Sequence, residues 1–232
     1  MEVDPFRHHP GWRDHIIDPQ TSRFRNIDLA ALDRARLGTS WRSSEEEREE
    51  SRRSIVAGRE HDGIWVFACG SLVWDPGIRF NEVRLAHVQG LSRRFCLRSK
   101  LGRGSPEKPG LMIGFDRGGA VASVAFHIAP ERVTEETRLL WRREMLVGGY
   151  RPEFVPASTA QGDIEALAFI VNTDSPNYMP ELDMLTAAQI IATAHGTYGS
   201  NLDYVANLVE RLDAFGIIDE SVAELYRLAS RQ

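Results

Sequence analysis

The chain has 232 residues, of which 42% are hydrophobic and 26% are charged, and its formal net charge at pH 7 is -5. This length suffices for one sizeable core with an appendage, and the proportions are those of a globular protein. The acidic balance argues against nucleic acid or an anionic membrane as a partner, since either would require a basic face. No apolar run reaches about 18 residues, so we expect no membrane span or secretory signal and predict a cytoplasmic protein.

The two cysteines, Cys69 and Cys96, form no CxxC pair and lie in apolar runs. This usage fits neither a disulfide framework nor a zinc site, so we expect both thiols to be reduced. His8 and His9 have no cysteine or carboxylate at ligand spacing, and we expect them to be surface histidines that hold no metal.

Residues 1–62 differ in character from the rest of the chain. They are irregular at first and then turn helical, and we interpret them as a partly helical N-terminal extension ahead of a domain over residues 63–232. A docking arm for a partner is the alternative interpretation of this extension.

Two short helices are predicted in the extension. Asp28 is placed to cap one over 29–36, and Ser43 or Ser44 is placed to cap the other. Nearly every residue of 45–53 is charged, so we expect the second helix to lie in solvent with almost no face to bury.

Short strands recur after residue 63. The run 65–69 is apolar or small throughout, which indicates a strand buried on both faces. A turn is expected at 117–119, between two of the later strands. These later strands are predicted over 83–88, 93–99, 111–115, 121–128 and 166–171.

Helical patterns follow or interrupt these strands. Apolar residues at helical spacing predict helices over 133–147, 187–194, 204–215 and 222–228. The strands lie too close together for βαβ units, so the order indicates an α+β fold. We expect a small mixed or antiparallel sheet that curls into a β-barrel.

Glu144 is the carboxylate that stands out. Its neighbours in the chain include a tryptophan, a leucine and a methionine, and a carboxylate in such surroundings has a raised pKa and can take and return a proton near neutral pH. The alternative is an ordinary helical glutamate in a solvated pair with Arg138, Arg142 or Arg143.

Gly70 and Ser71 end the first buried strand. A glycine there frees backbone N–H groups to point outward, where they can bind a carboxylate or phosphate. A plain strand end is the alternative, because a lone Gly-Ser pair is a weak motif.

Taken in order, several fragments resemble the ChaC-like γ-glutamylcyclotransferase family. Each fragment alone is weak, but together they run from about Trp65 to the C-terminus and leave the extension outside. They are 70–74, 93–95, 102–110, Arg143-Glu144, 148–151, Asn177-Tyr178, 194–196, Asn201 and Tyr204.

The resemblance implies a β-barrel with flanking α-helices that needs no cofactor and cleaves the γ-glutamyl bond of glutathione. The substrate's own α-amine attacks its γ-carbonyl, which gives 5-oxoproline and cysteinylglycine. Glu144 matches the family's proton acceptor. No Ser/His/Asp or Cys/His constellation is needed, because the substrate supplies the nucleophile.

The same resemblance implies the binding residues. Arg103, Tyr150 and Tyr204 are candidates to orient the substrate, with Arg103 suited to a carboxylate. The alternatives are half-buried aromatics and an arginine that braces its own loop, and His195 is expected to be structural. The loop that binds the γ-glutamyl part comprises Val66, Phe67, Ala68, Cys69, Gly70, Ser71 and Leu72.

Cys69 departs from the family pattern, which carries Gly-Tyr-Gly-Ser-Leu where this chain has Ala68-Cys69-Gly70-Ser71-Leu72. The phenol is lost, and a thiol flanked by apolar residues is expected to be inert. This departure motivates an alternative function, a catalytically weak γ-glutamyl-binding or regulatory protein. The sequence leaves the oligomeric state open, with a monomer favoured.

Overall fold

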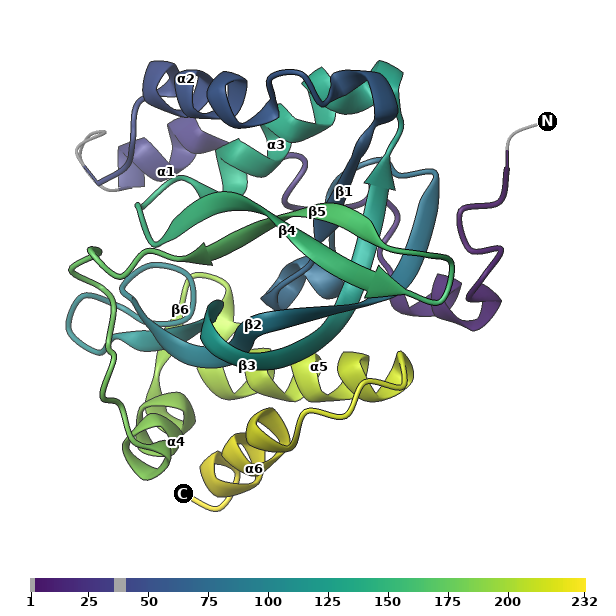
Figure 1. Cartoon of the computed structure of the whole chain (residues 1–232). Coiled ribbons are helices and arrows are strands. Elements are labelled where there is room, and N and C mark those ends of the chain that lie inside the picture. Colours follow the sequence, from purple (N-terminus) through teal and green to yellow (C-terminus); the bar gives the residue numbers. More distant parts are fainter. Residues whose placement is uncertain (1–2, 36–40) are drawn as a thin grey trace.

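A closed five-stranded β-barrel forms the centre of the molecule (Figure 1). The computed structural model describes residues 3–35 and 41–232. In barrel order the strands are β1 (Ile64–Phe67), β3 (Gly110–Ile128), β2 (Glu82–Ser99), β4 (Tyr150–Thr159) and β5 (Ile164–Val171). Strand β5 runs parallel to β1 and β3, and the other pairings are antiparallel. The prediction of a mixed barrel in an α+β fold is confirmed.

Two long strands, β2 and β3, replace the four short ones predicted between residues 83 and 128, and the turn predicted at 117–119 is wrong. Gly90 has φ 81° where the register of the pair shifts, while Gly118 and Gly119 have φ 99° and 77° within β3. Only glycine adopts such angles without strain, and here they produce bulges that bend a continuous strand around the barrel.

Strand β4 was not predicted. Its Pro152 and Pro156 cannot donate to a ladder, which argues against a central strand on sequence alone. In the register of the pair, Pro152 lies opposite Phe169 and Pro156 opposite Glu165 of β5, while β4 pairs with β2 only at Ala86 and His87. Most of β4 therefore has a ladder along one edge only, as in the edge strands where proline is found.

Helices cover the barrel on opposite sides (Figure 1). On one side lie α2 (Glu45–Val56) and α3 (Val133–Glu144), and on the other α4 (Met184–Thr193), α5 (Asn201–Ala214) and α6 (Glu220–Ala229). These confirm the helices predicted after the strands, although α3 ends at Glu144 rather than at residue 147. The remaining elements are α1 (Leu29–Ala35), the 3-10 turns η1 (Pro10–His15), η2 (Glu60–Asp62), η3 (Gly70–Val73) and η4 (Pro130–Arg132), and the hairpin β6 (His195–Gly196) and β7 (Gly199–Ser200).

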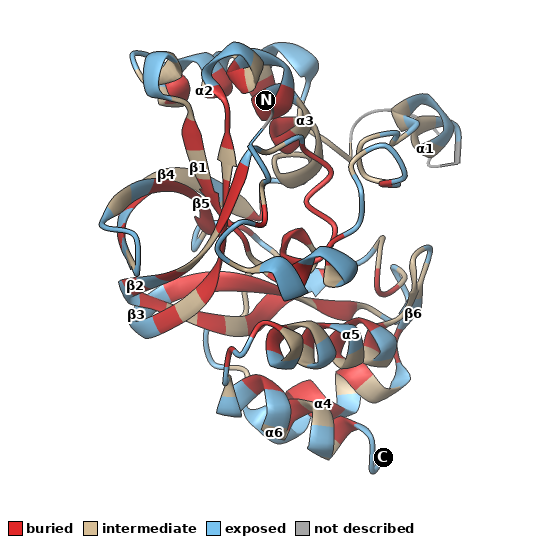
Figure 2. Cartoon of the chain, turned by 90° about the vertical axis from the view of Figure 1, so that its right-hand side faces the viewer, coloured by how far each residue is buried: buried red, intermediate tan, exposed pale blue. Residues whose placement is uncertain are grey.

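Apolar side chains fill the barrel and the layers between it and the helices. Phe67 and Phe115 stack inside the barrel with ring centroids 4.8 Å apart. Figure 2 shows the strands as mostly buried and the helices as buried on one side only. The extension contributes Phe6 and Trp12 to the larger core cluster, so it is packed onto the barrel.

Helix α2 is not the solvated helix expected. Arg48 and Arg52 are 7% and 5% exposed, and Arg52 donates to Thr137 of α3 at 3.1 Å. Trp141 of α3 donates to Ser51 at 3.1 Å. The expectation was wrong because arginine stems bury well when their guanidinium groups find partners.

The predicted helix caps are present. Ser44 accepts from the Glu47 N–H while Glu47 accepts from the Ser44 N–H, which is a capping box. Asp28 accepts from the Ala31 N–H at 2.9 Å at the start of α1. Arg36, placed at the end of that helix by the sequence, lies outside the described residues. Within 3–35 and 41–232, none of the helices combines the length and the apolar character needed to span a bilayer.

Candidate active site

The turn η3 follows β1 directly and begins at Gly70, whose φ is +56°. A Cβ atom at this position would overlap the Tyr204 hydroxyl of α5 and approach Ile113 of β3. Glycine is therefore required at this position for two reasons. The backbone is left-handed, and the Tyr204 side chain leaves no room for a Cβ atom.

A small pocket lies beside this turn. The centre of a water molecule can occupy about 20 Å³ of this cavity, which is room for one small chemical group. Side chains from β1, η3, β3, the end of α3, β4, β5 and α5 meet there. They are Phe67, Cys69, Ser71, Leu72, Met112, Ile113, Glu144, Tyr150, Phe169 and Tyr204.

Glu144 is the last residue of α3, and its side chain is 14% exposed. Burial raises the pKa of this carboxyl, and the adjacent Arg143 guanidinium limits the rise. The C-terminal end of a helix also disfavours a negative charge, which acts in the same direction as burial. The carboxyl is thus placed to exchange a proton with a group in the pocket.

Arg143 joins Glu144 to the turn. Its Nε lies 2.8 Å from a Glu144 carboxylate oxygen, and its Nη2 donates to the Ser71 Oγ at 2.9 Å. Its Nη1 donates to the carbonyls of Asp75 at 2.6 Å and Pro76 at 3.2 Å. One guanidinium therefore fixes the distance between the acidic side chain and the end of β1.

The sequence offered Arg143 only as a partner of Glu144 in a solvated pair; the pair is present but largely buried, and its link to Ser71 was missed. Adjacent residues do not usually face each other within a helix. In the last turn of α3 the Arg143 guanidinium nevertheless reaches the carboxylate of its neighbour Glu144, although only Glu144 lines the pocket. The signal available was the pair Arg143-Glu144 among the fragments that carry the family resemblance.

Two tyrosines complete the polar lining. Tyr150 donates to the Ile113 carbonyl at 2.7 Å, and burial raises its pKa well above the ordinary value. Burial likewise raises the pKa of Tyr204, which is 1% exposed. Both phenols stay protonated near neutral pH and keep a hydroxyl donor.

Arg103 does not line the pocket. Its Nη1 donates to the carbonyls of Tyr198 at 2.6 Å and Ser200 at 3.2 Å, and its guanidinium lies 5.0 Å from the centre of the Tyr204 ring. Arg103 thus stabilises the β6–β7 hairpin and packs against the Tyr204 ring. His195 is exposed on β6 and is also absent from the lining.

The loop assigned to the γ-glutamyl group divides at Cys69. Val66 and Ala68 are fully buried and do not line the pocket. The Ala68 N–H donates to the Val124 carbonyl at 2.9 Å, and the Ala68 carbonyl accepts from the Ser123 hydroxyl at 2.6 Å. Phe67, Cys69, Ser71 and Leu72 do line the pocket, with Gly70 shaping the turn between them. Burial raises the pKa of the Cys69 thiol to about 12, which makes it a weak nucleophile.

Three further pocket residues, Met112, Ile113 and Phe169, were not singled out from the sequence. They are apolar and belong to β3 and β5, where nothing in a strand pattern distinguishes a side chain that faces a pocket from one that faces the core.

The model of the ChaC-like protein family matches residues 64–232. The chain belongs to the ChaC-like family. It is 34% identical to the glutathione-specific γ-glutamylcyclotransferase of Escherichia coli (strain K12) over 184 residues, which are 78% of this chain and 80% of that protein. It is also 34% identical to glutathione-specific γ-glutamylcyclotransferase 1 of Mus musculus, over 66% of this chain and 71% of that protein.

A solved structure shares the fold of this ChaC-like protein. The crystal structure of a γ-glutamyl cyclotransferase specific to glutathione, from yeast, superposes with a TM-score of 0.68. The alignment covers 73% of this chain and 96% of the yeast chain at 22% identity.

Proposed function

We propose that this protein is an enzyme, a glutathione-specific γ-glutamylcyclotransferase that acts in glutathione catabolism. The observation that carries the proposal is the buried Glu144 carboxylate, tied through Arg143 to the Gly70-Ser71 turn and facing a pocket. The family membership and the names of the Escherichia coli and mouse relatives support the substrate class.

The reaction is an intramolecular aminolysis. Glu144 takes a proton from the α-ammonium group of the glutamyl residue, and the free amine attacks the γ-carbonyl carbon. The new C–N bond closes the lactam ring of 5-oxoproline, and the bond to the cysteine nitrogen breaks. Glu144 returns the proton to that nitrogen, the lactam nitrogen loses its second proton to the same nitrogen, and cysteinylglycine leaves in its ammonium form. No water and no cofactor are consumed, so the atoms balance.

Ring closure requires that the substrate be held in a folded conformation, with one small group of it in the pocket. An amine and a carbonyl held together within one folded substrate react at a high effective concentration, so the protein must mainly hold the fold and move the proton. The first N–H groups of a helical turn have no partner within it, which leaves those of Gly70 and Ser71 for the α-carboxylate or the developing oxyanion. Tyr150 and Tyr204 line the same space with neutral hydroxyls; that of Tyr150 donates to the Ile113 carbonyl and can accept from the substrate.

Two features bear on where and on what the enzyme acts. Both cysteines are free, which suits a reducing compartment and our assignment to the cytoplasm. Cys69 occupies the pocket where the family pattern has a tyrosine, so that this wall lacks a phenol. We assign binding of the γ-glutamyl part to the backbone of the turn, which does not depend on that side chain.

Product analysis in ¹⁸O-labelled water tests the proposal. Purified protein and glutathione are expected to give equal amounts of 5-oxoproline and cysteinylglycine, with no ¹⁸O incorporated. Labelled glutamate would show that water is the nucleophile. Tight glutathione binding by calorimetry without any product would favour the catalytically weak binding protein instead.

A further inference from the structure

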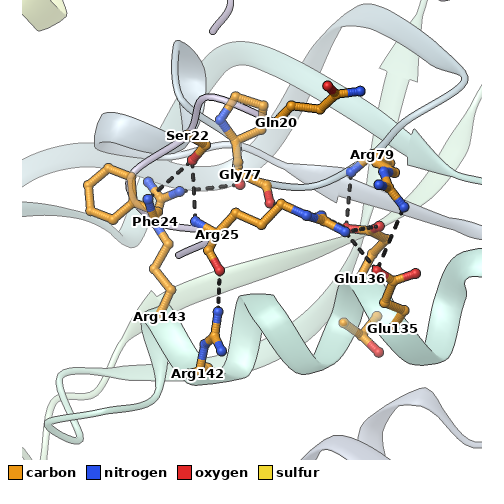
Figure 3. Close-up of polar contacts among 12 residues, drawn as sticks. Gln20, Ser22, Phe24, Arg25, Gly77, Arg79, Glu135, Glu136, Arg142 and Arg143 are labelled. Carbon is orange, nitrogen blue, oxygen red and sulfur yellow. Dashed lines mark hydrogen bonds and ion pairs between the residues drawn. The ribbon is translucent and has the colours of Figure 1, made fainter. Parts of the chain in front are cut away.

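A segment of the extension, Ser22–Arg25, lies between the loop after β1 and helix α3 (Figure 3). At one end the Ser22 hydroxyl donates to Asp75 at 2.5 Å, and Ser22 and Asp75 are only 0% and 3% exposed. At the other end Arg25 donates to Glu136 at 2.6 Å and to the Gly77 carbonyl at 3.3 Å. Buried partners at both ends fix the backbone of this segment against the domain.

The extension also contacts the chain on both sides of Glu144. Arg142 donates to the carbonyl of Arg25. Beyond α3, the Ser43 hydroxyl donates to the Met145 carbonyl at 2.7 Å, and the Ser43 N–H donates to the Leu146 carbonyl at 2.9 Å. The end of α3 that carries the carboxylate is therefore held by two separate parts of the extension.

Between the anchors of the segment, the Phe24 ring lies against the Arg143 guanidinium. The guanidinium carbon is 3.8 Å from the ring centre, and Figure 3 shows the two side chains next to each other. The edges of this guanidinium bind Glu144, Ser71 and the loop carbonyls, so the ring covers a face that hydrogen bonds leave free. An aromatic ring on the face of a desolvated cation attracts it and excludes water.

We propose that Phe24 is a positioning residue for the proton-transfer step, which holds Arg143 in the plane where it contacts Glu144 and Ser71 together. This inference rests on the proposed function and adds to it a residue from outside the family domain. Catalytic groups lose much of their effect when displaced by about 1 Å, so a mobile guanidinium would slow turnover more than it weakens binding.

Three substitutions of Phe24 distinguish the effect of the aromatic ring from the effect of side-chain size. Phe24→Leu keeps an apolar side chain but removes the aromatic face, and kcat is expected to fall roughly tenfold with a smaller change in KM. Phe24→Tyr keeps the ring and is expected to restore kcat to within about twofold. Phe24→Ala removes both and is expected to lose at least as much as the leucine variant.

A double-mutant cycle with Arg143→Lys decides whether Phe24 acts through Arg143. A lysine has no planar guanidinium, so in this background Phe24→Leu is expected to change kcat by less than about twofold. A tenfold loss in both backgrounds, or wild-type kcat in a folded Phe24→Leu protein, would overturn the proposal.

Phe6 provides the matched control. It belongs to the same extension, its ring lies 4.7 Å from the Arg13 guanidinium and packs against Phe80, and it does not line the pocket. Phe6→Leu is expected to lower the melting temperature but leave kcat and KM unchanged. An equal loss of kcat in this control would assign the effect of Phe24→Leu to general destabilisation.

A second readout needs no turnover. In protein labelled with ¹⁵N-arginine, the Arg143 Nε–H bonded to Glu144 is expected to exchange with solvent at least about tenfold faster in Phe24→Leu than in wild type. Unchanged exchange would reject the positioning role. If wild-type protein forms no 5-oxoproline, the proposed function fails, while this measurement still decides the role of Phe24.

Discussion

At the scale of single residues, two opposing effects set the pKa of Glu144. Burial is the larger and raises it, while the Arg143 guanidinium at 2.8 Å lowers it. Burial alone would favour the protonated acid, and pairing alone would favour the ionised, weakly basic carboxylate. Because burial is the larger effect, Glu144 accepts a proton at a higher pH than an ordinary glutamate does.

The pH dependence of kcat/KM, which reports groups of the free enzyme, follows from this balance. Glu144 must be ionised to accept a proton, so kcat/KM is expected to rise with pH through its raised pKa. We therefore expect the low-pH limb of kcat/KM above about pH 4.3, the ordinary value for glutamate. Arg143→Gln removes the lowering effect and should move that limb further up. A limb at or below the ordinary value, or a downward move in the variant, would contradict this explanation.

The contact between Gly70 and Tyr204 makes a second prediction at this scale. Gly70→Ala places a methyl group against the Tyr204 hydroxyl at a position with φ +56°. Urea unfolding should show a loss of more than about 1–2 kcal/mol, the ordinary cost of a left-handed non-glycine residue. Tyr204→Phe removes the closest atom and should recover part of that loss. Strictly additive effects of the two changes would mean that the hydroxyl does not press on the turn.

The sequence identified some of these residues for physical reasons and missed others. The apolar neighbours of Glu144 predicted its burial, and the glycine at a strand end predicted the turn. Arg143 was named as a partner of Glu144, but its contact with Ser71 was not predicted, because that contact depends on how α3 and the loop after β1 meet in space. Arg103 was placed in the site by resemblance alone, and the structure gives it a contact with the hairpin.

At the scale of elements, the sequence predicted which segments are extended better than where they begin and end. Gly118 and Gly119 indicated a turn, yet β3 continues through them because the residues on either side of the bulge stay paired with β2. The two prolines of β4 argued against a strand in the sequence, but β4 is a strand that pairs almost entirely with β5. Both errors have one cause, since a ladder is made with a distant segment that local patterns do not include.

The capping box of α2 gives an element-scale prediction. Ser44→Ala removes the acceptor for the Glu47 N–H, and the free energy of unfolding should fall by about 1 kcal/mol with turnover unchanged. Ser54→Ala, on the exposed side of the same helix, is the control and should not destabilise the protein, because alanine has the higher helix propensity. Equal effects of the two substitutions would show that the cap does not stabilise this helix.

At the scale of the whole molecule, the extension packs as part of the structure around the site. Its Phe6 and Trp12 join the core cluster, and its Arg25 reaches Glu136, a carboxylate with 0% exposure on α3. The composition of residues 1–62 predicted irregular and charged segments but not this packing, because arginines that bury through paired guanidinium groups look like surface residues in a sequence.

Glu136 tests how firmly the extension is attached. Besides Arg25, it accepts from the Arg79 N–H at 3.0 Å. Glu136→Ala leaves the Arg25 cation without its buried partner and should cost about 3–5 kcal/mol, with faster proteolysis of the extension. Glu135→Ala removes an exposed partner of the same arginine, at 2.7 Å, and should cost less than about 1 kcal/mol. Similar losses in the two variants would mean that the buried pair does not anchor the segment.

In the proposed reaction the carboxylate of Glu144 carries the proton as glutathione cyclises. The most direct test is the rate of 5-oxoproline formation by Glu144→Gln, with Glu49→Gln as a control in which another arginine-bound carboxylate is changed. We predict that the Glu144 variant stays folded and loses about a hundredfold to ten-thousandfold in kcat, while the Glu49 variant keeps the wild-type rate. A folded Glu144→Gln protein that forms 5-oxoproline at the wild-type rate would contradict the claim.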